Sequence, residues 1–438
     1  MNLKQHHKIL LGFVLGIIAG LICYYTFPIA QYPSFKFITQ VLTLIAGIFL
    51  RMIFMVVVPL LVSALILGVY ELGRGRGLGK VAKLSMMYTL GLSAIAVLLA
   101  IFMTNLFQPG AGVSADLSAL AKNASVIKIQ ANTAAVTDKV WVQYILDLFT
   151  QNPVDSAARA FNGEIISLMV FSLIFGYAMS YTVTDLNHPI IQGLNAVFET
   201  SLKVIGFAMK LAPYAIFSLI FNTVYALGAG FLENVLYFAL VVIGCIVFHQ
   251  LVVYALFLKL FGKVNPYQFF LKCRDVYLYA FSTASSNATL PVALETADKV
   301  LHLPPKIARF VLTIGASANQ NGSALFEGIT VLFLAQVFGI DLTLQNQIFV
   351  VLMAILAGVG TAGVPGGTLP IIAILLTSVG VPAEGIGLIL GVDRFLDMCR
   401  TVLNVSGDLV ITQLVTASLS ENELSNMEIA DEIETSEA

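Results

Sequence analysis

The segment LDMCRTVLNVSGD, residues 396–408, decides the fold, because it places several charged and amide side chains inside a strongly apolar part of the chain. The apolar segments GIGLILGV and LVITQLV flank it on either side. A helix turns by about 100° per residue, and on such a helix the polar residues share one arc of about 100°. These residues are Asp397, Arg400, Thr401, Asn404 and Asp408, and Asp393 and Arg394 extend the arc by one turn. A charged group in hydrocarbon costs about 2.5–3.5 kcal/mol on insertion scales, so this stripe must face a partner or a polar cavity.

The composition of the whole chain predicts an all-α polytopic membrane protein. Of the 438 residues, 58% are hydrophobic and only 11% are charged, with a mean hydropathy of +0.91. Soluble domains carry about 25% charged residues, and a soluble fold cannot bury this much apolar surface. We therefore expect membrane lipid around the protein. The net charge of −2 gives no basic surface for nucleic acid, and the four cysteines match neither a disulfide framework nor a metal site.

Apolar runs long enough to span a membrane follow one another along most of the chain. They are residues 8–28, 36–70, 81–107, 164–184, 196–228, 232–262, 301–338 and 382–416. Basic residues gather at 4–8, 74–83 and 259–274, which predicts a cytoplasmic N-terminus. No cleavage site follows the first apolar run, so we expect it to remain as a membrane helix. The polar segment 109–163 is then extracellular or periplasmic, and the acidic segment 417–438 is a cytoplasmic tail.

Two further apolar stretches, 268–298 and 345–379, each contain a small, polar, proline-containing turn at the centre. The turns read STASSNATLP and GTAGVPGGTLP, and both end in Thr-Leu-Pro. Arms of about 10–14 residues are too short to cross a bilayer, which predicts two re-entrant helical hairpins. Paired interrupted segments of this kind are typical of transporters built from inverted repeats.

The polar groups near these hairpins allow more than one interpretation. Asp397 is spaced for a purely structural ion pair with Arg400 or Arg394, although pairing leaves Asn404 and Asp408 unexplained. Residues 315–328, GASANQNGSALFEG, break the preceding span, either as a packing kink or as unwound backbone that lines a cavity. Glu327 is either a neutral structural residue or a proton carrier, because burial favours the protonated form of a carboxyl group.

Two other classes compete with a transporter. An intramembrane aspartic protease needs two carboxylates that face each other. The aspartates here follow one another along one helix, so we expect no enzyme. A passive channel also uses polar stripes and re-entrant loops, and only concentrative uptake distinguishes it from a carrier.

Four motifs, in order, resemble the glutamate transporter family, the dicarboxylate/amino acid:cation symporters, in a bacterial type of member. They are ASSNATLP, NQNGS, GTAGVPGG and LDMCRTVLNVSGD. The resemblance implies eight transmembrane helices, two re-entrant hairpins, inverted repeats, a homotrimer and an elevator mechanism in the inner (cytoplasmic) membrane. It divides the chain into scaffold helices (1–76 and 164–228), a third helix of the transport domain (77–108) and the remaining transport domain (229–416).

The resemblance also implies a substrate site for an acidic amino acid. In it Asp397 binds the α-amino group, Arg400 with Ser323 binds the side-chain carboxylate, and Asn404 with the hairpin tips holds the α-carboxylate. The implied substrate-binding residues are Ser285, Ser286, Ser323, Gly363, Val364, Asp397, Arg400, Thr401 and Asn404. Arg400 favours an acidic substrate, and Asp397 favours an amino acid over a plain dicarboxylate. Aspartate or glutamate is therefore the leading substrate, and a C4-dicarboxylate is the runner-up.

No cofactor is implied, only sodium ions, protons or both as coupling ions. The first implied sodium site comprises Gly315, Asn319, Asn404 and Asp408, and the second comprises Ser317, Gly358, Val359 and Thr361. The chain departs from the family at three positions. Asn321 stands where the family has an aspartate, and Gln320 stands where it has a methionine. Leu92, just before Ser93, stands where a residue with a hydroxyl group is expected. Loss of these oxygens predicts an absent or weakened third sodium site. Glu327 occupies the position of the proton-carrying glutamate of the animal carriers. Ala284 and Met398 stand at the two positions where members of the family carry an arginine, and we have no interpretation of its loss.

Overall fold

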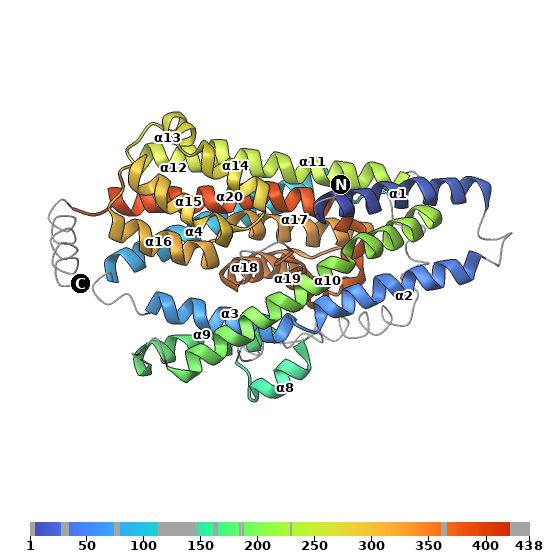
Figure 1. Cartoon of the computed structure of the whole chain (residues 1–438), viewed down its shortest axis with the longest axis horizontal. Coiled ribbons are helices and arrows are strands. Elements are labelled where there is room, and N and C mark those ends of the chain that lie inside the picture. Colours follow the sequence, from blue (N-terminus) through green and yellow to red (C-terminus); the bar gives the residue numbers. More distant parts are fainter. Residues whose placement is uncertain are drawn as a thin grey trace.

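The computed structural model describes residues 5–27, 35–73, 79–112, 146, 149–160, 165–183, 185, 188–227, 230–360 and 366–420. Every regular element among these residues is a helix, and most helices run along the long axis of the molecule (Figure 1). The predicted all-helical fold is confirmed.

One group of helices packs around a long, bent helix. Its members are α1 (Gln5–Thr26), α2 (Phe35–Phe54), α3 (Val57–Gly73), α9 (Ile165–Thr182) and α10 (Pro189–Leu227), with the short α8 (Pro153–Ala158) against α9. The segments 189–208 and 210–225 of α10 meet at an angle of 51°. Pro213 causes this bend, because its ring clashes with the carbonyl group four residues earlier in the helix. Gly16 lets α1 approach α10 closely: a methyl group there would lie 2.9 Å from the Phe217 carbonyl oxygen.

A second group of helices packs around α20, which carries the polar stripe. The group comprises α4 (Gly79–Phe107), α11 (Gly230–Phe248), the π-helix η2 (His249–Tyr254), α12 (Ala255–Leu260), α13 (Pro266–Lys272), α14 (Arg274–Thr283), α15 (Ser286–Lys299), α16 (Pro305–Ala318), α17 (Asn321–Val337), α18 (Leu344–Gly360), α19 (Leu369–Ser378), the 3-10 turn η3 (Ala383–Gly385) and α20 (Ile386–Ala417). Helix α17 is buried over nearly its whole length and packs against α4 and α20. The polar stripe therefore lies inside the molecule and not at its surface.

Both predicted hairpins are present as pairs of helices in contact, α14 with α15 and α18 with α19. In the first, Ala284 takes a left-handed conformation with φ of 49°, and Ser285 begins α15 as its N-cap. The arms α14, α15 and α19 have 10, 14 and 10 residues. The expectation of short arms was wrong for α18, which has 17 residues because the helix starts near the expected residue 345 and continues to Gly360.

Several expected boundaries also moved. Helix α10 begins at Pro189 and not at residue 196, since the polar residues of its first turns stay helical while exposed. The run 36–70 divides into α2 and α3 at a turn over Met55 and Val56. The run 301–338 divides into α16 and α17, which confirms the predicted break around NQNGS.

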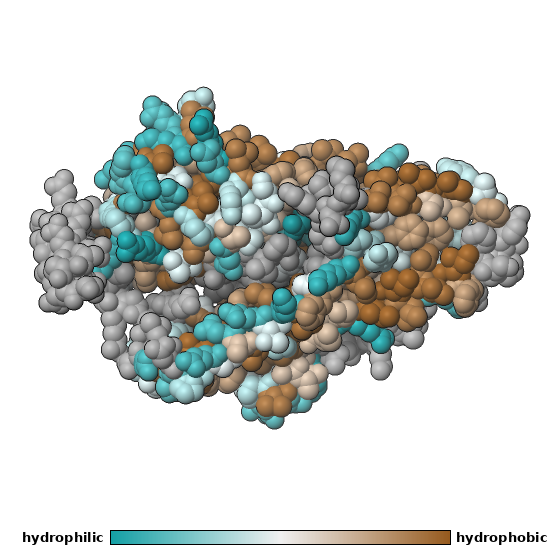
Figure 2. Space-filling view, viewed as in Figure 1, coloured by the Kyte–Doolittle hydropathy of each residue, from teal (hydrophilic) through white to brown (hydrophobic). Residues whose placement is uncertain are grey.

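By length and composition, three helical stretches of the described chain can cross a membrane: Phe37–Tyr70, Gly79–Phe107 and Leu232–Leu260. The bent helix α10 makes a fourth if its two segments count as one span. Other apolar helices, such as Ser167–Thr182 and Leu344–Gly358, are shorter. Figure 2 shows apolar side chains gathered over one end of the molecule, where α1, α2 and α11 lie, and hydrophilic ones over α13. Exposed apolar residues of this kind suit contact with lipid.

Candidate functional site

Arg400 is the most heavily bonded residue of the stripe. Its side chain is 1% exposed, and its Nη1 lies 2.9 Å from Asp393 Oδ1 while Nη2 lies 3.0 Å from Asp397 Oδ1. Nη2 also donates to Thr368 Oγ1 at 2.7 Å. The guanidinium carbon stands 4.3 Å from the centre of the Phe326 ring, a cation–π contact. These partners from α17, α19 and α20 fix the plane of the guanidinium group.

Asp397 connects the stripe to the second hairpin. Its Oδ2 accepts a hydrogen bond of 3.2 Å from the backbone N–H of Gly366 and lies 3.4 Å from Arg394 Nη1. The predicted ion pairs of Asp397 with Arg400 and with Arg394 are thus both present. The hydroxyl group of Thr401 is used inside the helix, where it donates to the Asp397 carbonyl oxygen at 2.7 Å.

Asn404 explains why the helix breaks at residues 319 and 320. The first N–H groups of a helix have no partner within that helix, and Asn404 Oδ1 accepts those of Gly322 (2.7 Å) and Ser323 (3.3 Å) at the start of α17. Asn404 Nδ2 donates to Gln320 Oε1 and to Ser323 Oγ. Gln320 Nε2 in turn donates to the Ala316 carbonyl oxygen at the end of α16. The break is therefore held by side-chain hydrogen bonds, and a simple packing kink does not describe it.

Asp408 lies one turn further along α20 and faces α16. Its Oδ1 accepts a hydrogen bond of 2.7 Å from Asn319 Nδ2. A methyl group at Gly315 would overlap this carboxylate, so glycine is needed for the close approach. The structure brings together the four residues predicted for the first cation site, Gly315, Asn319, Asn404 and Asp408, around the helix break.

Asn321, which stands where the family has an aspartate, is bonded at both ends of its amide. Its Nδ2 donates to Tyr254 Oη at 2.9 Å, and its Oδ1 accepts from Ser93 Oγ on α4. Leu92 beside Ser93 is fully buried. The groups that replace the family's anionic ligand are thus held within a network of neutral side chains.

The hairpin tips are described only in part. Ser285 and Ser286 are buried at the tip of the first hairpin, which packs on α20, and Ser285 Oγ accepts the N–H of Ala288 as a helix cap. Gly358 lies in α18 beside Ala324 and the Gln320 carbonyl oxygen. Ser317 and Val359 lie in the last turns of α16 and α18. The predicted residues Thr361, Gly363 and Val364 lie outside the described residues.

Glu327 is completely buried in α17, one residue after the ring that stacks on Arg400. Glu327 therefore lies on the helix whose neighbouring residue Phe326 contacts the stripe.

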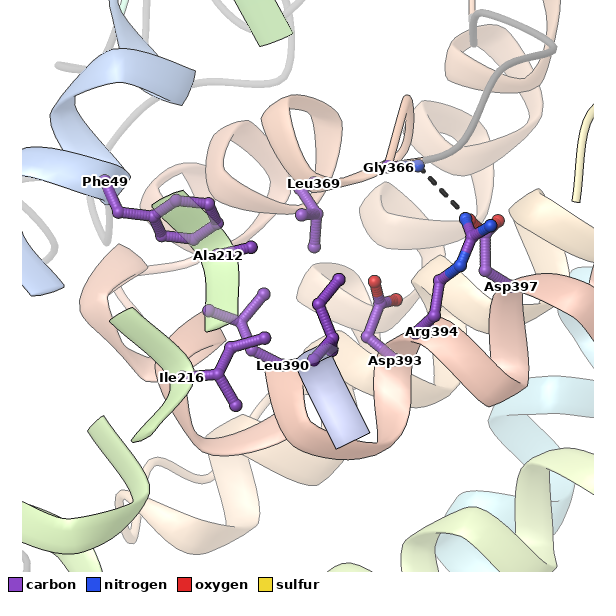
Figure 3. Close-up of a pocket in the computed structure, with 10 residues that line it drawn as sticks. Phe49, Ala212, Ile216, Gly366, Leu369, Leu390, Asp393, Arg394 and Asp397 are labelled. Atoms are coloured by element: carbon purple, nitrogen blue, oxygen red, sulfur yellow. Dashed lines mark hydrogen bonds and ion pairs between the residues drawn. The ribbon is translucent and has the colours of Figure 1, made fainter. Parts of the chain in front are cut away.

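A small hollow opens beside this cluster, between the two groups of helices. Figure 3 shows Asp393, Arg394 and Asp397 of α20 on one side, and Phe49, Ala212 and Ile216 of the first group on the other. Among the described residues, no group of three His, Cys, Asp or Glu side chains could hold a metal ion. Ions at this site would therefore depend on carbonyl, amide and single carboxylate oxygens.

Three contributors were missed by the sequence reasoning. Asp393 was counted only as an extension of the stripe, although its spacing of seven residues from Arg400 places both on one face of the helix. Thr368 belongs to the second Thr-Leu-Pro and so carried a weak signal. Phe326 carried none, because a phenylalanine in an apolar run is usually core.

Comparison with known proteins gives consistent matches over nearly the whole chain. The sequence profile of the sodium:dicarboxylate symporter family matches residues 6–418. The chain is 33% identical over 404 residues to the proton/sodium-glutamate symport protein of Bacillus subtilis, covering 92% of this chain and 89% of that protein. It is 34% identical over 403 residues to the proton/glutamate-aspartate symporter of Escherichia coli, covering 92% and 90%. A C4-dicarboxylate transport protein of Rhodospirillum rubrum is 29% identical over 371 residues, covering 84% and 80%.

Proposed function

The chain belongs to the sodium:dicarboxylate symporter family, and we propose that it is a secondary active symporter that takes up glutamate or aspartate with protons, sodium ions or both. The observation that carries the proposal is the buried set on α20, in which Asp397 and Arg400 lie side by side and Asn404 caps the break between α16 and α17. The names of the Bacillus and Escherichia relatives, both symporters of acidic amino acids, support it.

The substrate's charges match this arrangement group by group. Asp397 offers a carboxylate to the α-amino group, and Arg400 offers a planar fork to the side-chain carboxylate. Ser323 lies next to Asn404, with 3.2 Å between Ser323 Oγ and Asn404 Nδ2, so both can assist at the carboxylates. We assign Ser285, Ser286, Gly363, Val364 and Thr401 to the rest of the site on the resemblance alone.

For the coupling ions we propose a first sodium site at Gly315, Asn319, Asn404 and Asp408, and a second at Ser317, Gly358, Val359 and Thr361. The hydrogen bonds of Asn321 to Tyr254 and Ser93 support the loss of a third site, because they pair both the nitrogen and the oxygen of the amide with neutral groups. Glu327 is the proposed proton carrier. Its complete burial in α17, one residue after the Phe326 ring that contacts Arg400, supports this role, because burial favours the protonated form of a carboxyl group.

The architecture proposed with this function has eight transmembrane helices, two re-entrant hairpins and inverted repeats, assembled as a homotrimer in the cytoplasmic membrane. Residues 1–76 and 164–228 form the scaffold, and 77–108 with 229–416 form a transport domain that slides against it as an elevator. The packing supports this division, because α1, α2 and α3 pack on α10 and α9 packs on α3, whereas α11, α14, α16 and α17 pack on α20; the two groups also meet where α10 contacts α20. Residues 109–163 are the outer loop, and 417–438 are the cytoplasmic tail.

Uptake of labelled aspartate into proteoliposomes tests the function. We expect concentrative uptake driven by a pH gradient, a sodium gradient or both, which a channel cannot produce. Uptake that only equilibrates aspartate across the membrane would refute symport. Steep sodium dependence without any response to a pH gradient would refute the proton carrier alone.

The second candidate is a C4-dicarboxylate symporter, which the Rhodospirillum relative favours. Asp397 argues against it, because a second carboxylate beside Asp393 repels a substrate that has no amino group. Competition of unlabelled succinate against labelled aspartate separates the two. Succinate that competes as well as aspartate would favour the dicarboxylate function.

A further inference from the structure

Thr368 is a threonine at the start of a helix whose side chain does not bond to that helix. It is the N-cap residue of α19, where a threonine side chain normally accepts an N–H of the helix's first turn. The Thr368 side chain makes no such bond. Instead its Oγ1 accepts a hydrogen bond of 2.7 Å from Arg400 Nη2, and both side chains are buried. The Thr368 hydroxyl group thus bonds to Arg400 and not to the N–H groups of α19.

The donors of Arg400 are not all used. Nη1 and Nη2 hold the two aspartates, but Nε is buried and has no hydrogen-bond partner among the described residues. A guanidinium group offers five N–H donors in a fixed fork. A carboxylate that binds this arginine can therefore take Nε together with a second donor. The neutral hydroxyl of Thr368 yields such a donor more readily than a charged aspartate does, because charge-assisted bonds are about twice as strong as neutral ones.

A hydroxyl group can donate as well as accept. Within the described part of the chain, the hydrogen of the Thr368 hydroxyl has no acceptor, so it is available to an incoming anion. A substrate carboxylate oxygen bound at Arg400 Nη2 would lie next to Thr368 Oγ1, since both oxygen atoms would contact the same nitrogen atom. Thr368 can then turn from acceptor of the arginine to donor to the carboxylate.

We propose that Thr368 is a specificity-determining residue for the substrate's side-chain carboxylate, which it binds jointly with Arg400. This inference rests on the proposed function, and it adds to that function a contact from the second hairpin. The backbone N–H of Gly366, two residues earlier, already bonds Asp397. Gly366 and Thr368, just before α19, therefore contact both Asp397 and Arg400, so these residues lie where the acidic side chain of the substrate would bind.

The test compares Thr368→Val with Thr368→Ser by uptake of labelled aspartate into proteoliposomes under one fixed gradient. Valine keeps the shape of threonine without the hydroxyl, and serine keeps the hydroxyl. We expect Thr368→Val to raise the KM for aspartate about tenfold, which corresponds to about 1.4 kcal/mol, with Vmax changed less than about twofold. Thr368→Ser should stay within about twofold of the wild type in KM.

The matched control is Thr377→Val on the same helix. Thr377 Oγ1 donates to the Ala373 and Ile374 carbonyl oxygens of α19 itself, so its loss should leave the KM unchanged. An unchanged KM in Thr368→Val would overturn the inference, as would an equal loss in Thr368→Ser. If the valine protein does not accumulate, Thr368→Ala replaces it in the same comparison. Wild-type protein that takes up neither aspartate nor glutamate would refute the proposed function instead, so the two failures are distinct.

Discussion

Replacing Arg400 by cysteine tests the central assignment of the site. In the proposed complex the guanidinium fork makes two charge-assisted hydrogen bonds to the substrate's side-chain carboxylate, each contributing about 1.5–3 kcal/mol. Their loss amounts to about 3–6 kcal/mol, which is a decrease in affinity of about a hundredfold or more. The change also leaves Asp393 and Asp397 with Arg394 as their nearest cation, and these aspartates then repel an acidic side chain.

The assay is binding and uptake of labelled aspartate by purified Arg400→Cys protein, with thermal melting as a check on folding. Removing one partner of a buried ion pair costs about 3–5 kcal/mol of stability, so the melting temperature should fall. The matched control is Arg274→Cys, because Arg274 is largely exposed at the start of α14. A neutral amino acid, which brings no side-chain carboxylate, should lose much less affinity than aspartate. Folded Arg400→Cys protein with unchanged aspartate affinity would refute the assignment.

Three further substitutions test the coupling ions. Glu327→Gln, which holds no exchangeable carboxyl proton, should abolish uptake driven by a pH gradient and spare uptake driven by sodium; equal loss under both gradients contradicts the carrier role. Asn321→Asp restores an anionic oxygen beside Ser93 and Tyr254, so uptake should become steeper in sodium concentration; an unchanged sodium dependence shows that this site does not bind the ion. Gly315→Ala pushes the Asp408 carboxylate away and should raise the half-saturating sodium concentration at least about tenfold. Its control is Gly47→Ala, where a methyl group meets no neighbour, and equal effects in both proteins contradict the cation site.

The helical projection of α20 was sufficient to predict that its polar groups act together, because a regular helix fixes their directions. Asp397, Arg400, Asn404 and Asp408 are all buried in the structure, as the stripe requires. The interruption at NQNGS was predictable for the same local reason, since asparagine and glycine are poor helix formers. What the pattern could not supply was the partner of each group.

The hydrogen-bond partners of the stripe residues come from elements far apart in the chain, and this explains why the sequence did not predict them. Thr368 reaches Arg400 across 32 positions, and Asn404 caps α17 from 82 positions away. Tertiary contacts of this range leave no periodicity in the sequence. The length of α18 was missed for another reason: the stretch was expected to start at residue 345, one residue from the observed start, but its apolar run has no stop signal before the tip, so composition could not place the end of the helix.

The charges of the site also give a reason why uptake must be coupled to cations. Arg394 and Arg400 balance Asp393 and Asp397, so these four side chains together carry no net charge. Aspartate or glutamate brings two carboxylates and one ammonium group, which leaves the loaded site one charge negative. Burial of an uncompensated charge is strongly unfavourable, so in the proposed elevator mechanism the loaded site needs a cation within reach before it moves through the membrane. In the proposed function Asp408 and Asn319 hold this cation as sodium, and Glu327 holds it as a proton. Coupling then follows from electrostatic balance, and the substrate itself creates the demand for the ion.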